Sequence, residues 1–136
     1  MKCFAVIDTN VLVSALLSKN EDAATVQVLS KMFLSAFTSL FSDEILSEYS
    51  QVLKRKKYHF SEHLVNQLIN AIEKTGQKVY PAFTGEVLPD MKDLPFYEVV
   101  MEKQHEGAYL VTGNMKHFPS KHFIVTPREF INILNS

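Results

Sequence analysis

Apolar segments alternate along the chain with longer segments of helical periodicity. The first of them, residues 3–7, has no polar position, which is typical of a parallel strand buried on both faces. Further strands are predicted at 37–41, 79–80, 108–111 and 123–125, the one at 79–80 having the weakest pattern. Helical spacing of apolar residues is found at 11–17, at about 22–34, after Ser42, over 64–72, after Asp93 and after Thr126.

Turn and capping residues lie between these segments. Ser42 and Asp43 are typical of a helix N-cap, and Gly76 is typical of the C′ position after a helix. The sequence at 126–129 predicts a capping box with proline at the first helical position. Strands that alternate with helices imply a parallel sheet covered on both sides, a three-layer α/β domain. With only 5 Pro and 4 Gly and no linker-like stretch, residues 1–136 are expected to form one domain.

Composition narrows the classes of function. A net charge of −1, from 14 Lys plus Arg against 15 Asp plus Glu, excludes a chain that binds nucleic acid by net charge alone. Cys3, the single cysteine, cannot form an internal disulfide, so we expect a reducing cytoplasm. No apolar run approaches the roughly 18 residues of a membrane span, and no membrane association is expected.

Four acidic residues fall where parallel sheets bind ligands, at the carboxyl ends of strands. Asp8 ends the first strand, and Asp90 and Asp93 lie in the loop and helix start before the strand at 108–111. Glu48 lies at the margin of the apolar face of its helix, pointing toward the sheet. Carboxylates that converge repel one another unless a cation lies between them, which predicts a hard divalent ion.

Each acid also has a structural interpretation. Asp8 and Asp93 each precede a predicted helix, so either side chain can simply cap it. Glu48 can be an ordinary solvated helix residue. Other chemistries have little support, because the glycine-rich phosphate loops are absent and the five histidines are scattered.

Several segments in order resemble the PIN domain family, in particular its small prokaryotic members related to the VapC-type ribonuclease toxins. They are 6–14 (VIDTNVLVS), Ser42 with 48–49 and 52–53, Asp90 and Asp93 before a helix, 110–113 (LVTG), and 126–130 (TPREF). The resemblance implies a three-layer α/β/α PIN-like fold with a central parallel sheet of four or five strands, and a metal-dependent ribonuclease.

The family's acids map onto Asp8, Glu48 and Asp93, with Asp90 as an adjacent candidate ligand. These are the expected catalytic acids, and Asp8, Asp93 and Asp90 are the expected ligands of Mg²⁺ or Mn²⁺. Supporting polar positions match Thr9, Asn10, Thr112 and Asn114. Asn114 stands where the family often has a fourth acid, so a second metal ion should bind weakly or not at all.

Two basic patches are expected to bind RNA at the rim of this acidic centre. They are Lys54, Arg55, Lys56 and Lys57, followed by Tyr58 and Phe60 as stacking residues, and Lys116, His117 and Lys121 near Asn114. The first patch has an equally good interpretation as a solvated helix C-terminus. Subtracting Asp8, Glu48 and Asp93 from the net charge leaves −1 + 3 = +2 for the remainder.

The leading hypothesis is a divalent-metal-dependent endoribonuclease, the toxin component of a toxin and antitoxin pair. The alternative is a catalytically weak PIN-fold module that binds RNA or a partner, which Asn114 favours. Apolar residues near the start of the chain point to a homodimer or antitoxin interface, with burial inside the monomer as the competing interpretation. They are Leu12, Leu16, Leu17, Val26, Val28, Leu29, Met32 and Phe33.

Overall fold

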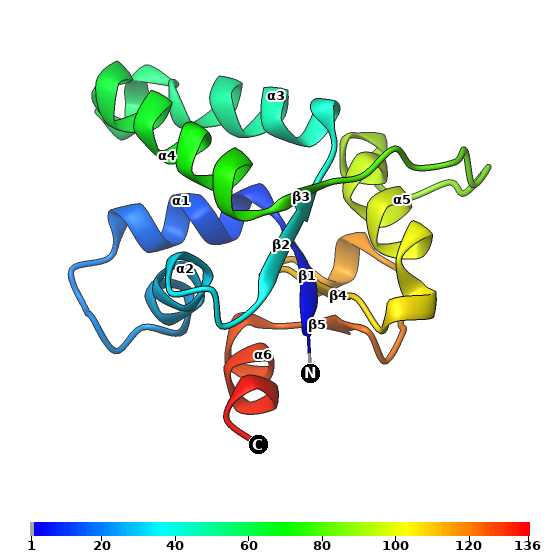
Figure 1. Ribbon diagram of the computed structural model, residues 1–136. Helices are drawn as coiled ribbons and strands as arrows, with labels where there is room; N and C mark the ends of the chain where they lie inside the picture. The colour runs from blue at the N-terminus through cyan, green and yellow to red at the C-terminus, as the bar shows by residue number, and fades with distance from the viewer. Residues whose placement is uncertain (1) are drawn as a thin grey trace.

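The computed structural model, which describes residues 2–136, has a five-stranded parallel sheet with helices on both faces (Figure 1). Its strands are β1 (Phe4–Ile7), β2 (Thr38–Phe41), β3 (Gln77–Lys78), β4 (Tyr109–Val111) and β5 (Ile124–Val125). They follow the order β3-β2-β1-β4-β5, and each neighbouring pair is parallel. The predicted three-layer α/β fold with a parallel sheet is confirmed.

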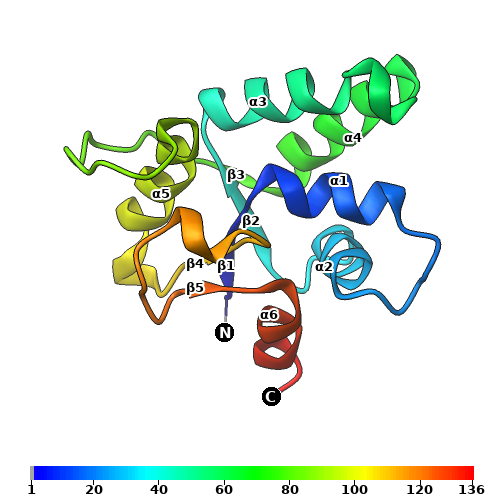
Figure 2. The ribbon, with the colours of Figure 1, turned by 180° about the vertical axis from the view of Figure 1, so that it is seen from behind.

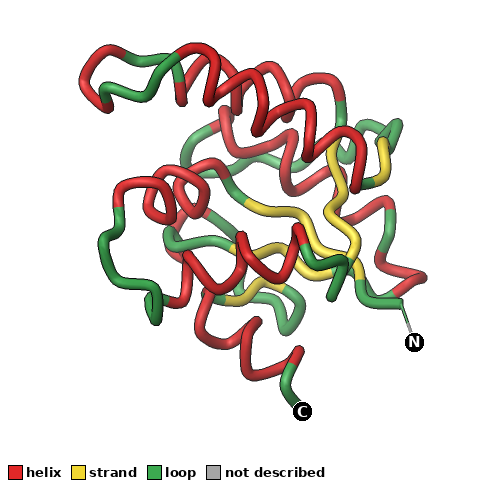
Figure 3. Tube along the Cα trace, turned by 60° about the vertical axis from the view of Figure 1, so that its left-hand side comes forward, coloured by secondary structure: helices red, strands yellow, loops and turns green. Residues whose placement is uncertain are grey.

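Six α-helices surround the sheet, and short 3-10 turns join several of them. The helices are α1 (Thr9–Leu17), α2 (Ala24–Phe33), α3 (Asp43–Leu53), α4 (Glu62–Thr75), α5 (Leu94–Glu102) and α6 (Pro127–Leu134). α5 packs on β1, β2 and β4, while α1, α2 and α6 lie on the other side of the sheet (Figure 2). Figure 3 shows the strands in the middle of the molecule with helices around them.

The predicted capping residues start their helices as expected. The Ser42 hydroxyl accepts a hydrogen bond from the Ile45 N–H at the start of α3. Thr126 and Glu129 form the reciprocal capping box of α6, with Pro127 at its first position. α3 is thereby fixed directly after β2, and it runs across the end of the sheet where β1 ends.

The third strand lies two residues earlier than the hydrophobic pattern predicts. β3 is Gln77–Lys78, which pairs with Leu40 and Phe41 of β2, and Tyr80 is 78% exposed. β3 is an edge strand that is largely exposed, so its side chains need not be apolar. The hydrophobic pattern therefore does not determine its register, which follows from where α4 ends. Only the Val79 N–H, which donates to the Phe41 carbonyl at 2.7 Å, continues the ladder.

Gly76 ends α4, but not as the left-handed C′ residue that its position suggests. Its φ is −98°, in the extended region that any residue adopts. The requirement is for space, since a Cβ built here would lie 2.5 Å from the Ser39 carbonyl oxygen and 2.9 Å from the Phe41 ring. A glycine therefore lets the end of α4 approach β2 closely enough for β3 to pair.

We expect Gly76→Ala to destabilise the protein by about 2 kcal/mol, because the contacted atom is sheet backbone and cannot move aside. Chemical denaturation followed by circular dichroism measures this loss, with Asn70→Ala on the exposed face of α4 as the control. Equal stability of the two variants would contradict the close-approach explanation.

The apolar residues near the start of the chain are divided between the core and the surface. Leu12, Val28 and Met32 are buried within the monomer, whereas Leu17 and Phe33 are 51% and 38% exposed. Burial within the monomer thus explains some of these apolar residues, and Leu17 and Phe33 remain exposed as candidates for an interface. Across residues 2–136, no helix has the length and hydropathy required to cross a membrane.

Candidate active site

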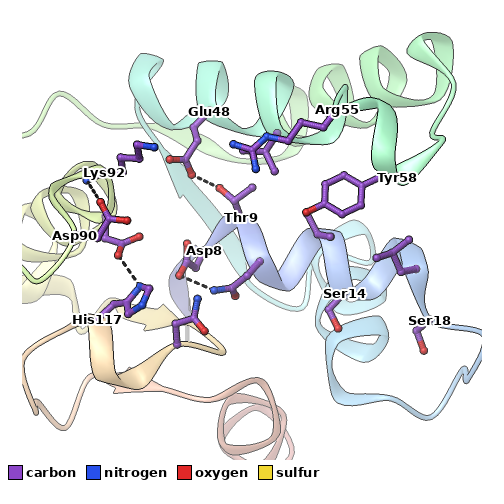
Figure 4. Close-up of a pocket in the computed structure, with 16 residues that line it drawn as sticks. Asp8, Thr9, Ser14, Ser18, Glu48, Arg55, Tyr58, Asp90, Lys92 and His117 are labelled. Atoms are coloured by element: carbon purple, nitrogen blue, oxygen red, sulfur yellow. Dashed lines mark hydrogen bonds and ion pairs between the residues drawn. The ribbon is translucent and has the colours of Figure 1, made fainter.

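A cavity of about 720 Å³ opens at the carboxyl end of the sheet, between α1, α3 and the start of α5. All four predicted acids line it, as do Thr9, Asn10 and Asn114 (Figure 4). The remaining lining residues are Val13, Ser14, Leu17, Ser18, Val52, Arg55, Tyr58, Lys92 and His117. Asp8 and Glu48 are 40 positions apart in sequence and line the same cavity, as predicted from the end of the first strand and from the apolar face of the helix that carries Glu48.

Asp8 lies at the floor of the cavity and is 4% exposed. Its backbone N–H donates to the Val111 carbonyl at 2.9 Å, which extends the pairing of β1 with β4. Although Asp8 occupies the N-cap position of α1, its side chain makes no capping hydrogen bond. The carboxylate instead accepts hydrogen bonds from Thr112 and Asn10, so the capping interpretation of this side chain is wrong.

Burial raises the pKa of Asp8 from 3.8 to about 6, because the charged carboxylate loses its hydration. The nearby charges of Asp93 and Glu48 raise the pKa further, and the Thr112 hydrogen bond lowers it. The protein alone offsets little of the free-energy cost of a carboxylate charge that is buried and also repelled by two other carboxylates. The environment favours either a proton or a cation at this position.

Glu48 reaches the cavity because α3 is anchored at the neighbouring residue. The buried Tyr49 hydroxyl donates to the carbonyl of Ile7, the last residue of β1. Glu48 then faces the start of α1, where the Thr9 hydroxyl donates to its carboxylate. Burial and the charge of Asp93 raise its pKa, while Thr9 and the Arg55 guanidinium lower it. Glu48 is half-buried, so the interpretation of a fully solvated helix residue is wrong.

Asp93 precedes α5, and its side chain does not cap that helix. One carboxylate oxygen lies 2.9 Å from Nδ1 of His117, in a contact between the start of α5 and the turn after β4. Burial raises the pKa of Asp93, and the His117 interaction opposes that rise. Asp90 is more exposed and caps the 3-10 turn Met91–Asp93 through the Lys92 N–H at 3.0 Å.

Three of the four supporting polar residues, Asn10, Thr112 and Asn114, form one connected hydrogen-bond network around Asp8, while the Thr9 hydroxyl donates to Glu48. Thr112 donates to Oδ2 of Asp8 at 2.7 Å and accepts from the Asn114 N–H at 2.9 Å. Asn10 donates to the same Oδ2 at 3.1 Å, and its amide oxygen accepts from the Gly113 N–H at 3.2 Å. The turn after β4 is thus tied to the turn after β1, which holds the Asp8 carboxylate in one orientation.

The predicted basic patches reach the cavity only in part. Arg55 and His117 line it, and the other five predicted residues lie outside the lining. These five are Lys54, Lys56, Lys57, Lys116 and Lys121. Lys54 pairs with Glu62 at 3.8 Å, which agrees with the interpretation of a solvated helix end for that residue.

The structure gives His117 and Lys92 positions in the site that the sequence does not predict, and it gives the buried Tyr49 a specific contact. His117 was assigned to an RNA patch, but it binds Asp93. Lys92 lines the cavity beside Asp90, and Tyr49 anchors α3 to β1. Helical spacing places Tyr49 on the apolar face of its helix, and it is buried as this predicts, whereas no sequence pattern links His117 to a residue 24 positions away.

A family model described as PIN domain matches residues 5–116 of the chain. The chain belongs to the PIN domain family. Among curated proteins no match was found. The match runs from the second residue of β1 to Lys116, and within it lie all the residues that line the cavity of this PIN domain except His117. Proteins with this domain are generally nucleases, which supports an enzyme of that broad class.

Proposed function

We propose that this PIN domain is a divalent-metal-dependent endoribonuclease that hydrolyses RNA phosphodiester bonds with Mg²⁺ or Mn²⁺. One observation carries the proposal: carboxylates from three separate elements, Asp8, Glu48 and Asp93, converge on one cavity, where Asp93 and Glu48 raise the pKa of Asp8 and Asp93 raises the pKa of Glu48. Such mutual repulsion at a functional edge of a sheet is expected when a cation normally lies among the acids.

The donor set fits a hard cation that keeps part of its hydration shell. All the acidic groups offer oxygen ligands, which Mg²⁺ and Mn²⁺ prefer. Over residues 2–136, no three His, Cys, Asp or Glu side chains are close enough together to form a closed ligand cluster. Mg²⁺ usually binds through one or two carboxylates and several waters, so an open set of acids around a cavity suits it.

In this proposal each residue has a distinct task. Asp8 and Asp93 hold the cation, with Asp90 at the rim as a further ligand, and Glu48 orients the attacking water through its free carboxylate oxygen. When bound, the ion supplies charge neutralisation of the scissile phosphate and acidification of a water molecule. Thr112 and Asn10 keep Asp8 in a single orientation, which lowers the cost of arranging the site before reaction.

We further propose that the protein is the toxin component of a toxin and antitoxin pair acting in the cytoplasm. The sequence resemblance to VapC-type ribonucleases and the lack of a second cysteine support this. The exposed Leu17, Phe33 and Leu34 offer apolar surface for an antitoxin or a second copy. Co-expression with the product of a neighbouring small open reading frame tests it, since a true antitoxin should relieve growth inhibition and bind stoichiometrically.

The enzyme proposal is tested with purified protein and end-labelled cellular RNA. Cleavage should occur with millimolar Mg²⁺ or Mn²⁺ and stop in EDTA. Equal cleavage in EDTA, or none with either ion, would contradict it.

Asn114 favours a second candidate, a PIN-fold module that binds RNA or a partner with little catalysis. Its amide lines the cavity where a further acid would add negative charge, and the acids form no closed ligand cluster within the described residues 2–136. This candidate predicts RNA binding that persists in Asp8→Asn and no metal-dependent cleavage by the unmodified protein.

His117 should support the reaction by holding Asp93. We expect His117→Ala to lower metal-dependent cleavage by about 10- to 100-fold, the usual effect of losing an outer partner of a metal ligand. The loss should be partly restored by raising the metal concentration, which a loss of folding would not allow. His122→Ala, an exposed histidine outside the cavity, is the matched control, and equal activity of both variants would contradict this role.

A further inference from the structure

The cavity has two chemically different ends. The acids lie at one end, and the other, where Ser14 and Ser18 also lie, is walled by Val13 and Leu17 of α1, Val52 of α3 and Tyr58 of the 3-10 turn Lys56–Tyr58 (Figure 4). We propose that this second end, the apolar half, binds the nucleobase of a nucleotide next to the scissile phosphate of single-stranded RNA. The inference rests on the proposed function and specifies how its substrate is held.

Tyr58 is the residue best placed to contact a base. Figure 4 shows it at the cavity between Arg55 and Ser14. Phe60 stacks on its ring, with centroids 5.7 Å apart and planes 19° from parallel, which restricts how the ring can turn. A half-buried aromatic ring held in this way can contact a base with little further loss of side-chain entropy.

The charges around the apolar half match a nucleotide. Within residues 2–136 neither Arg55 nor Lys57 forms an ion pair, although the Arg55 guanidinium is near enough to Glu48 to lower the pKa of that carboxyl. Arg55 lines the cavity, and Nζ of Lys57, which is outside the lining, lies over the Tyr58 ring at 5.1 Å from its centroid. In the proposed subsite these two cations bind the phosphates on either side of a base that contacts Tyr58.

This combination of groups favours RNA over the other classes of occupant. An apolar peptide segment would use the Val13, Leu17 and Val52 walls but would gain nothing from the unpaired cations. A free phosphate would use the cations but leave the apolar walls in water. A ribonucleotide satisfies both, and its continuous backbone would lead the next phosphate toward Asp8.

A double-mutant cycle between the protein and the RNA tests the proposal. Fluorescence anisotropy in EDTA, where RNA is not expected to be cut, gives the affinity of a labelled single-stranded oligoribonucleotide and of versions in which one nucleotide at a time is abasic. We expect an abasic nucleotide at one or two adjacent positions to weaken binding about tenfold. Tyr58→Ala should lose about the same factor on the intact RNA and little more on those abasic versions.

Matched variants control for folding and for general surface effects. Tyr80→Ala removes a tyrosine that is 78% exposed and outside the cavity, and it should bind RNA normally. Leu17→Ser removes a second wall of the apolar half at a 51% exposed position, so it should fold and weaken binding about threefold. Its control is Leu34→Ser, which is 74% exposed and does not line the cavity.

The outcomes separate this inference from the proposed function. Coupling between Tyr58→Ala and particular abasic positions supports the base subsite even if Mg²⁺ and Mn²⁺ give no cleavage, in which case only the nuclease proposal fails. Metal-dependent cleavage with RNA affinity unchanged in both Tyr58→Ala and Leu17→Ser overturns the subsite and leaves a protein segment as the occupant of the apolar half. Equal losses on intact and abasic RNA also overturn it, because Tyr58 would then not contact a base.

Discussion

Asp8→Asn is expected to reduce metal-dependent RNA cleavage by about three orders of magnitude in a protein that is folded and more stable than the unmodified chain. Asp8 is the most buried of the acids and is held by Thr112 and Asn10 at the floor of the cavity. An amide there cannot supply the charge that holds a divalent ion. Charge stabilisation by a bound metal contributes several kcal/mol, so the rate should fall by about 10³-fold.

The gain in stability follows from the pKa of Asp8, which rises from 3.8 to about 6 on folding. Above pH 6 the folded state must hold a buried charge that the unfolded state hydrates freely, so the ionised group opposes folding. A shift of this size corresponds to at most about 3 kcal/mol. Asparagine keeps an oxygen that can accept from Thr112 and Asn10 and removes the charge, so Tm should rise by several degrees near neutral pH in EDTA.

The measurement pairs RNA cleavage rates with thermal unfolding in EDTA for the same preparations. Asp22→Asn is the control, because Asp22 is exposed and does not line this cavity. It should change neither quantity. If Asp8→Asn cleaved RNA at the normal rate, Asp8 would have no catalytic role. If it were less stable than the unmodified protein, the buried charge of Asp8 would not destabilise the folded state as proposed.

The positions of the acids could be predicted because each depends on local pattern. A strand with no polar residue is predicted to lie in the middle of a parallel sheet. Asp8 follows that strand directly, so it is predicted at the edge of the sheet where the strands have their carboxyl ends. Glu48 borders the apolar stripe of α3, and that stripe fixes which side of the helix faces the sheet. The same reasoning predicted the fold, since alternating strands and helices leave few topologies other than a parallel sheet.

Tertiary contacts decided what the pattern could not. The shift of β3 to Gln77–Lys78 depends on the space that Gly76 leaves above the Ser39 carbonyl, which no periodicity records. His117 meets Asp93 only because the turn after β4 folds back toward α5. The capping alternatives for Asp8 and Asp93 could be rejected only from side-chain hydrogen bonds, because an N-cap aspartate and a ligand aspartate occupy the same place in sequence.

Divalent metal should stabilise the protein, and the effect should grow with pH. Burial and like charge raise the pKa values of Asp8, Glu48 and Asp93, so the metal-free protein binds protons more tightly when folded than when unfolded. The free energy of unfolding should therefore fall as the pH rises from about 4 to about 6 and then level off. Mg²⁺ or Mn²⁺ binds the ionised carboxylates, so it should restore stability chiefly above pH 6.

At a metal concentration a hundred times its Kd, the expected gain is about 2.7 kcal/mol. Thermal unfolding with millimolar MgCl₂ or MnCl₂ measures it, with NaCl at the same ionic strength as the control for general screening. The Asp8→Asn variant should show no metal-dependent rise in Tm. Absence of the rise in the unmodified protein, or an equal rise in the variant, would contradict a metal site among these acids.

Asn114→Asp extends the same measurement to the position where the cavity has an amide instead of an acid. A fourth carboxylate should destabilise the metal-free protein by repulsion and strengthen metal binding by about tenfold, or about 1.4 kcal/mol. The two effects have opposite signs, so a variant that is less stable in EDTA yet more stable in millimolar Mg²⁺ would show that Asn114 limits the charge of the site. If both stabilities moved in the same direction, the amide would have only a packing role, and the prediction that Asn114 weakens a second metal site would be wrong.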